Sequence, residues 1–328
     1  MTTPMRILLT GKSGQIGSEL ARLLPRVGEV TAIGRSELQL AEPDDIRRVI
    51  AQARPDLIIN AAAYTAVDQA ENEEPLSRAI NADAPAIFAE EANKIGALLI
   101  HYGTDYVFDG AKRSPYSEDD PTRPLSAYGR TKLAGEEAIR ASGVPHLILR
   151  TAWIYSTAGR NFLLTILRLA CSGEELRIVN DQFGAPTWAR AIAQATARLI
   201  GAPDCAGGSR VLTSTIDGAQ FAGADRLAFL ADRTGTYHLT AAGVTSWYEF
   251  AVAVLNAAHK IPPDTPWLAA VTSGRPFVAK RIIPITTQDY PTPARRPAYS
   301  VLSNARFAET FGFSLPDWRL QLSQALSS

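Results

Sequence analysis

This chain of 328 residues has little cysteine and no excess of either charge. Only Cys171 and Cys205 occur, and they are not at metal-ligand spacing, which argues against a disulfide framework and against a cysteine metal site. Lysine plus arginine equals aspartate plus glutamate at 33 each. This balance gives no electrostatic reason to expect a nucleic acid or an anionic membrane as a partner.

The sequence also lacks an apolar run of about 18 residues, the length that a membrane-crossing helix needs. Its start, MTTPMRILLTG, has no cleavage region of the kind that ends a signal peptide. We therefore expect a soluble cytoplasmic protein. The patterns HExxH, CxxC and G-x-S-x-G are absent, so metallohydrolase and serine-hydrolase activities have no support, and no metal site is expected.

Hydrophobic residues make up 46% of the chain and charged residues 20%, which is the composition of an ordinary globular protein. In the first half, short apolar runs alternate with amphipathic stretches that have helical spacing. This alternation predicts an α/β fold with a doubly wound parallel sheet, of the Rossmann type, covered by helices on both faces. The runs predicted as buried strands are 6–10, 29–33, 56–62, 97–104 and 146–152.

The strand-helix alternation weakens after about residue 152. We predict a dinucleotide-binding domain over 1–152 and a smaller α/β substrate-binding domain over 153–328. Segments near 187–200 and 235–241 have the patterns of a helix and a strand that return to the first sheet.

Two later segments differ in composition from the rest. Residues 201–235 are rich in Gly, Ala and Asp, and we predict a surface excursion there. Proline is frequent from 261 to 297, which predicts an irregular part of the second domain.

Glycines stand at the turn after the first predicted strand. The segment TGKSGQIG places Gly11, Gly14 and Gly17 in a G-x-x-G-x-x-G pattern, which differs from the G-x-G-x-x-G spacing. Glycines permit a tight turn and let a pyrophosphate approach backbone N–H groups at a helix N-terminus. The pattern favours a dinucleotide site over the alternative of a glycine-rich turn without a ligand.

The end of the second predicted strand bears on the choice of cofactor. It reads Ile33-Gly34-Arg35-Ser36, where an acidic residue would bind the 2′-hydroxyl of NAD. Arg35 can instead pair with a 2′-phosphate in a bidentate manner. The sequence therefore favours NADPH, with NADH as the alternative if Arg35 is only a solvated loop residue.

The pentapeptide YGRTK places Tyr128 four residues before Lys132, on one face of a predicted helix. Ketone reduction needs a hydride on carbon and a proton on oxygen. A tyrosine can supply that proton, and a nearby ammonium lowers the pKa of the phenol. Thr104 ends a predicted strand, where a parallel sheet exposes its carboxyl edge to ligands. The alternatives are a surface Tyr/Lys pair and a threonine that only terminates a strand.

Longer stretches of the sequence carry a resemblance to a known family. They are TGKSGQIGSEL, NAAAYTAVDQAE, HYGTDYVFDG, AYGRTKLAGE, RTAWIY followed by GRNF, NDQFGAPT, GTYHL, SWYEFA and YPTPARRPAYSVL. In this order, and over nearly the whole length, the chain resembles the extended short-chain dehydrogenases/reductases, and within them the dTDP-4-dehydrorhamnose reductase family.

The resemblance implies roles for individual residues. It makes Thr104, Tyr128 and Lys132 the catalytic triad. The implied cofactor-binding residues are Gly11, Gly14, Gln15, Ile16, Gly17, Arg35, Gln39, Leu40, Ala61, Ala62 and Ala63, together with Tyr128 and Lys132. The implied substrate-binding residues are Thr65, Val67, Asp68, Thr104, Asp105, Trp153, Asn180, Gln182 and Arg296.

Several substrate roles compete with structural ones. Trp153 is expected against the deoxysugar ring or in the core, and Asp105 is expected to orient the substrate or to form a turn. Arg296, in a loop, has a planar donor fork that suits a diphosphate. The histidines His101 and His238 are expected to be structural.

Some positions depart from the family pattern. Gly103 stands where a small hydroxyl residue is usual, and Gln39 stands where an aspartate is frequent. Some relatives dimerise through magnesium held partly by two glutamates, whose positions match Glu19 and Arg190 here. An arginine cannot bind magnesium, so we expect a monomer or a homodimer that needs no metal.

The expected activity is the NADPH-dependent reduction of the C4 ketone of a dTDP-linked 4-keto-6-deoxysugar to dTDP-L-rhamnose, a precursor of surface polysaccharide. Two alternatives stay open. One is a reductase of another nucleotide-linked 4-ketosugar. The other is a non-catalytic dinucleotide-binding protein, such as the regulatory subunit of methionine adenosyltransferase, although the intact triad argues against it.

Overall fold

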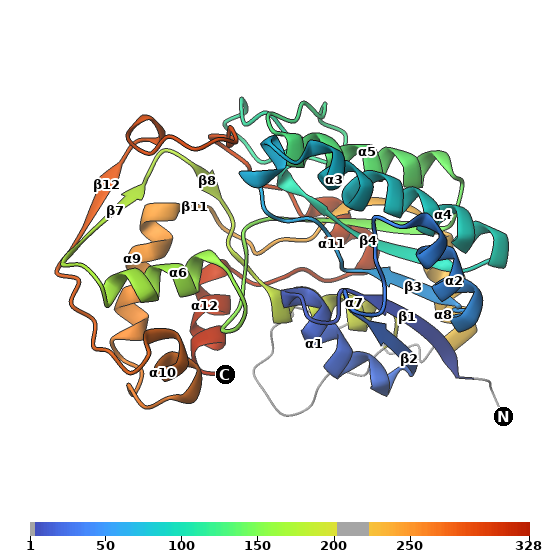
Figure 1. Cartoon of the computed structure of the whole chain (residues 1–328), viewed down its shortest axis with the longest axis horizontal. Helices are drawn as coiled ribbons and strands as arrows, with labels where there is room; N and C mark the ends of the chain where they lie inside the picture. Colours follow the sequence, from blue (N-terminus) through green and yellow to red (C-terminus); the bar gives the residue numbers. More distant parts are fainter. Residues whose placement is uncertain (1–3, 202–222) are drawn as a thin grey trace.

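A parallel sheet of six strands forms the larger of two lobes, which lie side by side in this computed structural model (Figure 1). The structure describes residues 4–201 and 223–328. The strand order is β10-β5-β4-β3-β1-β2, with each pair parallel. The strands are β1 (Met5–Thr10), β2 (Gly28–Ile33), β3 (Leu57–Asn60), β4 (Leu98–Thr104), β5 (His146–Thr151) and β10 (Gly235–His238).

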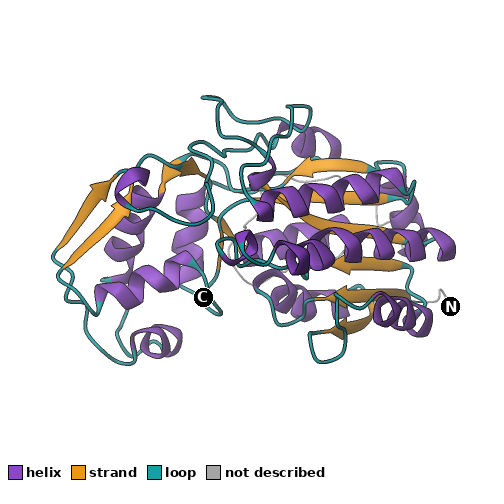
Figure 2. Ribbon diagram, turned by 45° about the horizontal axis from the view of Figure 1, so that its top comes forward, coloured by secondary structure: helices purple, strands orange, loops and turns teal. Residues whose placement is uncertain are grey.

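Helices cover both faces of this sheet, as the view in Figure 2 shows. Alternate strand residues serve the two faces, so Leu8 and Leu99 belong to one apolar cluster and Leu9 and Ile100 to the other. This two-sided burial explains why the strands are almost continuous apolar runs. The helices of this lobe are α1 (Gln15–Leu23), α2 (Pro43–Ala53), α3 (Glu74–Arg78), α4 (Ala84–Ile95), α5 (Ala127–Ala141), α7 (Ala189–Leu199), α8 (Gly223–Ala231) and α11 (Ala305–Phe311). The doubly wound α/β prediction is confirmed.

In the described part of the chain, short strands and four helices make up the smaller lobe, at the left of Figure 1. The strand pairs are β7 (Glu175–Val179) with β12 (Arg281–Ile285), β8 (Phe183–Gly184) with β11 (Thr245–Ser246), and β6 (Ile154–Tyr155) with β9 (Thr187–Trp188). The helices are α6 (Phe162–Ala170), α9 (Trp247–Ala258), α10 (Pro266–Thr272) and α12 (Trp318–Leu326).

The chain returns from the second half to the first sheet. Helix α7 packs against α1, and β10 pairs in parallel with β5 at the edge of the sheet. Of the predicted excursion over 201–235, residues 202–222 lie outside the described residues, and the described remainder contains α8 and the first residue of β10.

The proline-rich stretch 261–297 holds more regular structure than its composition indicates. Pro266 is the first residue of α10, where its missing N–H loses no helical hydrogen bond. Pro284 lies in β12, which among the described residues pairs with β7 alone and so has an unpaired edge there. Among the described residues, no helix is both long and apolar enough to cross a membrane.

Candidate active site

The glycine turn joins β1 to α1 at the carboxyl edge of the sheet. Gly11 has φ +75°, and a Cβ there would lie 2.8 Å from the backbone of Ala61. A Cβ on Gly17 would lie 2.0 Å from the carbonyl oxygen of Gly11. No side chain caps α1 at Gly14. Backbone N–H groups at this helix end can therefore meet a pyrophosphate, so the turn has the features that a dinucleotide needs.

The loop after β2 contains a carboxylate that the strand-tip interpretation overlooked. Glu37 folds back to accept the N–H of Gly34 at 2.8 Å, and its other oxygen pairs with Lys12. Arg35 is exposed beside this pair. The predicted adenine contact Gln39 donates to the carbonyl oxygen of Arg35 at 2.9 Å, and thereby braces the same loop. The three-residue spacing from Gly34 to Glu37 was the available signal for this turn.

Thr104 and Tyr128 meet at the end of β4. Thr104 is the last residue of β4, and Tyr128 is in the first turn of α5, whose N-cap Ser126 accepts the N–H of Gly129. The hydroxyl groups of Thr104 and Tyr128 are hydrogen-bonded. Burial raises the pKa of Tyr128 to about 12, against the lowering effect of that hydrogen bond. Tyr128 therefore stays protonated at neutral pH, as a proton donor must be.

Lys132 lies one helical turn further along α5 and is 2% exposed. Its Nζ donates to the carbonyl oxygen of Tyr102 at 2.7 Å and lies 3.1 Å from Nε2 of His101. Burial lowers the pKa of Lys132 to about 8, while the charge of Glu136 raises it. The described contacts of Lys132 Nζ are thus with β4 and not with the phenol of Tyr128.

Asp105 follows Thr104 directly and is 2% exposed. Thr104 Oγ1 donates to Asp105 Oδ1 at 3.2 Å, whereas Oδ2 has no hydrogen-bond partner among the described residues. Burial raises the pKa of Asp105 to about 7, and hydrogen bonds from Ser300 and Thr104 oppose this rise. A carboxyl group that changes charge near neutral pH therefore lies beside the hydroxyl pair.

Arg296 reaches the site from the long C-terminal loop. Its Nη2 donates to Asp68 Oδ2 at 2.8 Å, and Nη1 contacts Thr292 and the carbonyl oxygen of Ala294. A hydrogen bond also links Arg296 to Tyr106, whose ring packs edge-on against Tyr128 with centroids 5.6 Å apart. Two residues predicted to bind substrate, Asp68 and Arg296, thus form one cluster that connects to the proposed proton donor.

Trp153 follows β5 in a left-handed backbone conformation, with φ +47°. Its ring stacks on Trp247, the first residue of α9, with centroids 3.5 Å apart and planes 5° apart. A Cβ on Gly184 would lie 2.4 Å from the Trp153 ring. The ring is half-buried. This strained and supported tryptophan is typical of a functional position, and the sequence interpretation assigned no role to Trp247.

Other predicted site residues lie in different surroundings. Asn180 accepts a hydrogen bond from Ser246 at 2.6 Å, and buried Gln182 donates to Thr287 at 3.0 Å, so the amides of both have partners within the smaller lobe. Thr65 is exposed and Val67 half-buried in the loop after β3. Residues 61–63, Gln15 and Leu40 are half-buried near the glycine turn and the β2 loop, while Ile16 is buried.

A buried ion pair explains the glycine at position 103. Arg150 Nη2 donates to Glu136 Oε2 at 2.7 Å, and both side chains are almost fully buried. A Cβ on Gly103 would lie 2.4 Å from Glu136 Oε1 and 2.8 Å from Arg150 Cγ. The ion pair fills the space that a serine or threonine would take.

Glu19 and Arg190 bind each other directly. Arg190 Nε donates to Glu19 Oε2 at 3.1 Å, and Arg22 also contacts this carboxylate. Among the described residues, no group of three or more His, Cys, Asp or Glu side chains could hold a metal ion.

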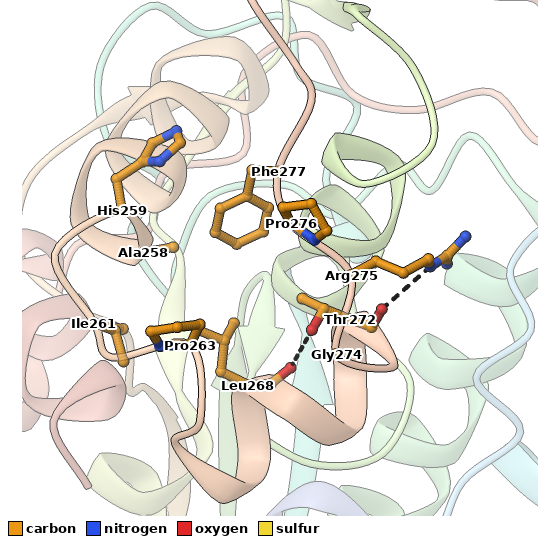
Figure 3. A pocket seen from close by; sticks show the side chains of 10 residues that line it. All are labelled: Ala258, His259, Ile261, Pro263, Leu268, Thr272, Gly274, Arg275, Pro276 and Phe277. Carbon is orange, nitrogen blue, oxygen red and sulfur yellow. Dashed lines mark hydrogen bonds between the residues drawn. The ribbon is translucent and has the colours of Figure 1, made fainter.

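A separate cavity of about 370 Å³ lies in the smaller lobe (Figure 3). His259, Leu268, Arg275 and Phe277 are among its lining residues, which come from α9, α10 and the loops beside them. Figure 1 shows these helices in the lobe opposite β4 and α5. The cavity contains none of the residues predicted to bind cofactor or substrate.

Comparison with known proteins matches this chain to a family model and to full-length relatives. Residues 5–328 match the model of the RmlD substrate binding domain. The dTDP-4-dehydrorhamnose reductase of Burkholderia thailandensis is 45% identical over 96% of each chain. That of Escherichia coli K12 is 40% identical over 98% of this chain and 97% of its own.

The chain belongs to the dTDP-4-dehydrorhamnose reductase family. Solved structures agree with this assignment. The reductase of Clostridium acetobutylicum superposes with a TM-score of 0.81 at 32% identity, over 98% of this chain and 99% of that one. The reductase of Bacillus anthracis, solved in complex with NADP, has a TM-score of 0.80 at 28% identity over the same shares. The family and the α/β fold predicted from the sequence are confirmed.

Proposed function

We propose that this protein reduces the C4 ketone of dTDP-4-dehydro-L-rhamnose to dTDP-L-rhamnose with NADPH. The observation that carries the proposal is the hydrogen-bonded pair Thr104 and Tyr128 at the end of β4, with Lys132 buried one turn behind it. Relatives named as dTDP-4-dehydrorhamnose reductases align with almost the whole chain. The product is a precursor of surface polysaccharide.

The cofactor would be held along the carboxyl edge of β1 and β2. Gly11, Gly14 and Gly17 leave room for the pyrophosphate at the start of α1. Arg35, exposed in the loop after β2, would pair with the 2′-phosphate. When bound there, NADPH supplies the hydride for the ketone carbon. NADH stays a weaker alternative because it lacks the phosphate.

The protein's own residues manage the proton. Tyr128, with its pKa raised to about 12, holds its proton until the ketone oxygen gains negative charge, and then donates it. The Thr104 hydroxyl, bonded to that of Tyr128, positions the ketone oxygen. Lys132, one helical turn away on α5, would provide the positive charge that favours the phenolate left behind.

The substrate would be held by residues from both lobes. Arg296 would bind the diphosphate, because its guanidinium lies between Asp68 and Tyr106 close to Tyr128. Trp153 would pack against the deoxysugar ring, supported from behind by Trp247. Thr65, Val67, Asp105, Asn180 and Gln182 stay candidates for further contacts.

We infer a cytoplasmic enzyme that acts as a monomer or as a homodimer without metal. The two cysteines of the chain suit a compartment that keeps thiols reduced. Neither nucleic acid nor a membrane surface is an expected partner, because the charges balance.

An assay with purified protein, NADPH and enzymatically prepared dTDP-4-dehydrorhamnose tests the proposal. We expect NADPH oxidation with this sugar and much slower oxidation with its GDP and UDP analogues. Faster turnover of another nucleotide sugar would favour the reductase of a different 4-ketosugar. NADPH binding without oxidation of any of them would favour a non-catalytic dinucleotide-binding protein.

A further inference from the structure

A chain of buried polar groups leads from the first strand to Lys132. Thr10 Oγ1 donates to Asn60 Oδ1 at 2.7 Å, Asn60 Nδ2 lies 3.2 Å from His101 Nδ1, and His101 Nε2 lies 3.1 Å from Lys132 Nζ. These four side chains come from β1, β3, β4 and α5, and each is at most 2% exposed. These groups are therefore out of contact with bulk water.

The backbone fixes the direction of this chain at Asn60. The N–H of Ala62 lies 3.3 Å from Asn60 Oδ1, and a backbone N–H can only donate. The amide oxygen must therefore face Ala62, which leaves the amide N–H to donate to His101 Nδ1. A neutral imidazole has one N–H, so its proton is on Nε2. Burial keeps the pKa of His101 well below its ordinary value, so the ring is neutral.

The Nε2 proton then points at Lys132 Nζ. An ammonium has only donors, so it would face this N–H donor to donor. A neutral amine can accept from Nε2 and still donate to the carbonyl oxygen of Tyr102, at 2.7 Å. The ammonium fits only if the imidazole proton moves to Nδ1 and the Asn60 amide turns over, which places its NH₂ against the N–H of Ala62.

We propose that Asn60 and His101 are positioning residues that couple the charge of Lys132 to the tautomer of His101. The arrangement described here is the one with a neutral amine. This inference concerns the buried row of polar side chains from Thr10 to Lys132. It bears on catalysis only through the role that the proposed function gives to Lys132.

The other charged and titratable groups near Lys132 are bound by partners of their own, so the charge of Lys132 depends mainly on His101. Glu136, on the same helix, raises the pKa of Lys132, but Arg150 from β5 binds its carboxylate with contacts as short as 2.7 Å. Asp105, after β4, bonds to Thr104, and the Tyr128 phenol also bonds to Thr104. The pKa of Lys132, lowered to about 8 by burial, agrees with an amine that is easily neutralised.

Nuclear magnetic resonance on the intact protein without added NADPH tests the coupling. The chain has six lysines and four histidines, so ¹³Cε-lysine and ¹⁵N-imidazole signals are few enough to assign, with Lys132→Arg identifying the Lys132 signal. We expect the His101 proton on Nδ1 at pH 6 and on Nε2 at pH 10. The change of tautomer should have the same midpoint as the Lys132 titration. A His101 tautomer that stays constant while Lys132 titrates would overturn the proposal.

Asn60→Asp reverses the hydrogen bond between residue 60 and His101, because a carboxylate can only accept a hydrogen bond from the imidazole. This variant should hold the proton on Nδ1 at every pH and raise the Lys132 midpoint by about 1–3 pH units. Asn81→Asp, a change at another buried asparagine, near Thr131 on α5, controls for the added charge and should leave the tautomer change intact. If both variants gave the same result, the effect would be one of charge alone and the coupling would be refuted.

The rate of reduction gives a second readout. If Lys132 acts as an ammonium, kcat should fall as pH rises through the Lys132 midpoint, and Asn60→Asp should move that fall to higher pH by the same shift. An unmoved kcat profile with a moved Lys132 midpoint would contradict the proposed role of Lys132 in catalysis. It would leave the coupling measured by resonance in place.

Discussion

At the scale of single residues, burial and not direct contact with Lys132 sets the character of Tyr128. The sequence interpretation expected the lysine to lower the pKa of the phenol, whereas burial raises it to about 12. The difference suits reduction, because a donor must keep its proton until the ketone oxygen becomes basic. The lysine charge is then needed only after the proton has left.

Replacing Tyr128 by phenylalanine should therefore remove the proton donor and little else. We expect kcat to fall about 10²- to 10⁴-fold, with NADPH affinity nearly unchanged. Steady-state kinetics together with NADPH titration would measure both. Tyr237→Phe is a matched control, since its hydroxyl bonds to the carbonyl oxygen of Arg233 and to Thr310, away from the site. A Tyr128→Phe enzyme within about threefold of the original rate would contradict the assignment.

Asp105 should make stability depend on pH in an unusual direction for an aspartate. Its pKa is raised from 3.8 to about 7 in the folded protein, so the folded state binds this proton more tightly. The resulting stabilisation is fully present below about pH 4 and is lost as pH rises towards 7. Relative to Asp105→Asn, the free energy of unfolding should fall by about 1.4 kcal/mol per pH unit across this window.

Urea unfolding of both proteins at several pH values between 4 and 7.5 would measure this difference. The comparison with the asparagine variant cancels the effects of all other titrating groups, because both proteins contain them. A difference that grew with pH would show that Asp105 is ionised and partnered in the folded protein.

At the scale of elements, the loop after β2 should decide between the two cofactors. Only NADPH has a 2′-phosphate for Arg35 to bind, so Arg35→Ala should weaken NADPH much more than NADH. The loss of one charge-assisted hydrogen bond should cost about 1.5–3 kcal/mol of NADPH binding. Fluorescence titration with each cofactor would measure it, with Arg48→Ala, at an exposed position of α2, as control. Equal losses for both cofactors would mean that Arg35 only supports the loop.

The packing of β4 between α5 and β5 should make Gly103 hard to replace. A Cβ at this position meets the buried Glu136–Arg150 pair at 2.4 Å, and an ion pair of this kind cannot move without losing partners. We expect Gly103→Ala to lower the free energy of unfolding by about 1–3 kcal/mol. Gly173→Ala, whose Cβ would have no closer neighbour than 3.7 Å, should change it little. Thermal or urea unfolding that gave equal stabilities would contradict this account.

The sequence predicts well what depends on local pattern. Strands such as β4 are apolar throughout because both faces are buried, and the spacing of Tyr128 and Lys132 places them on one face of α5. The sequence predicts poorly what depends on contacts between distant segments. Glu37 with Lys12, Trp247 behind Trp153, and Asn60 beside His101 are pairs that only the fold brings together. Composition also hid α10 and β12, because a proline can begin a helix or lie in an edge strand.

At the scale of the whole molecule, the Glu19–Arg190 pair bears on assembly. Magnesium needs hard oxygen ligands, which carboxylates supply and a guanidinium cannot. Glu19 is already bound by Arg190 at 3.1 Å and contacted by Arg22, so two guanidinium groups already neutralise its carboxylate. An assembly through magnesium at this surface would have to break the Arg190 contact and accommodate its positive charge.

We therefore expect the oligomeric state, whether a monomer or a dimer formed by another surface, to be the same in magnesium and in EDTA. Light scattering after size-exclusion chromatography would measure it in both buffers. Arg190→Glu is the informative variant, because it replaces the guanidinium by a second carboxylate beside Glu19. A magnesium-dependent dimer that formed only in this variant would show that the arginine is what prevents metal binding. A dimer of the unmodified chain that dissociated in EDTA and returned with magnesium would show that Glu19 and Arg190 are not the equivalents of the metal ligands.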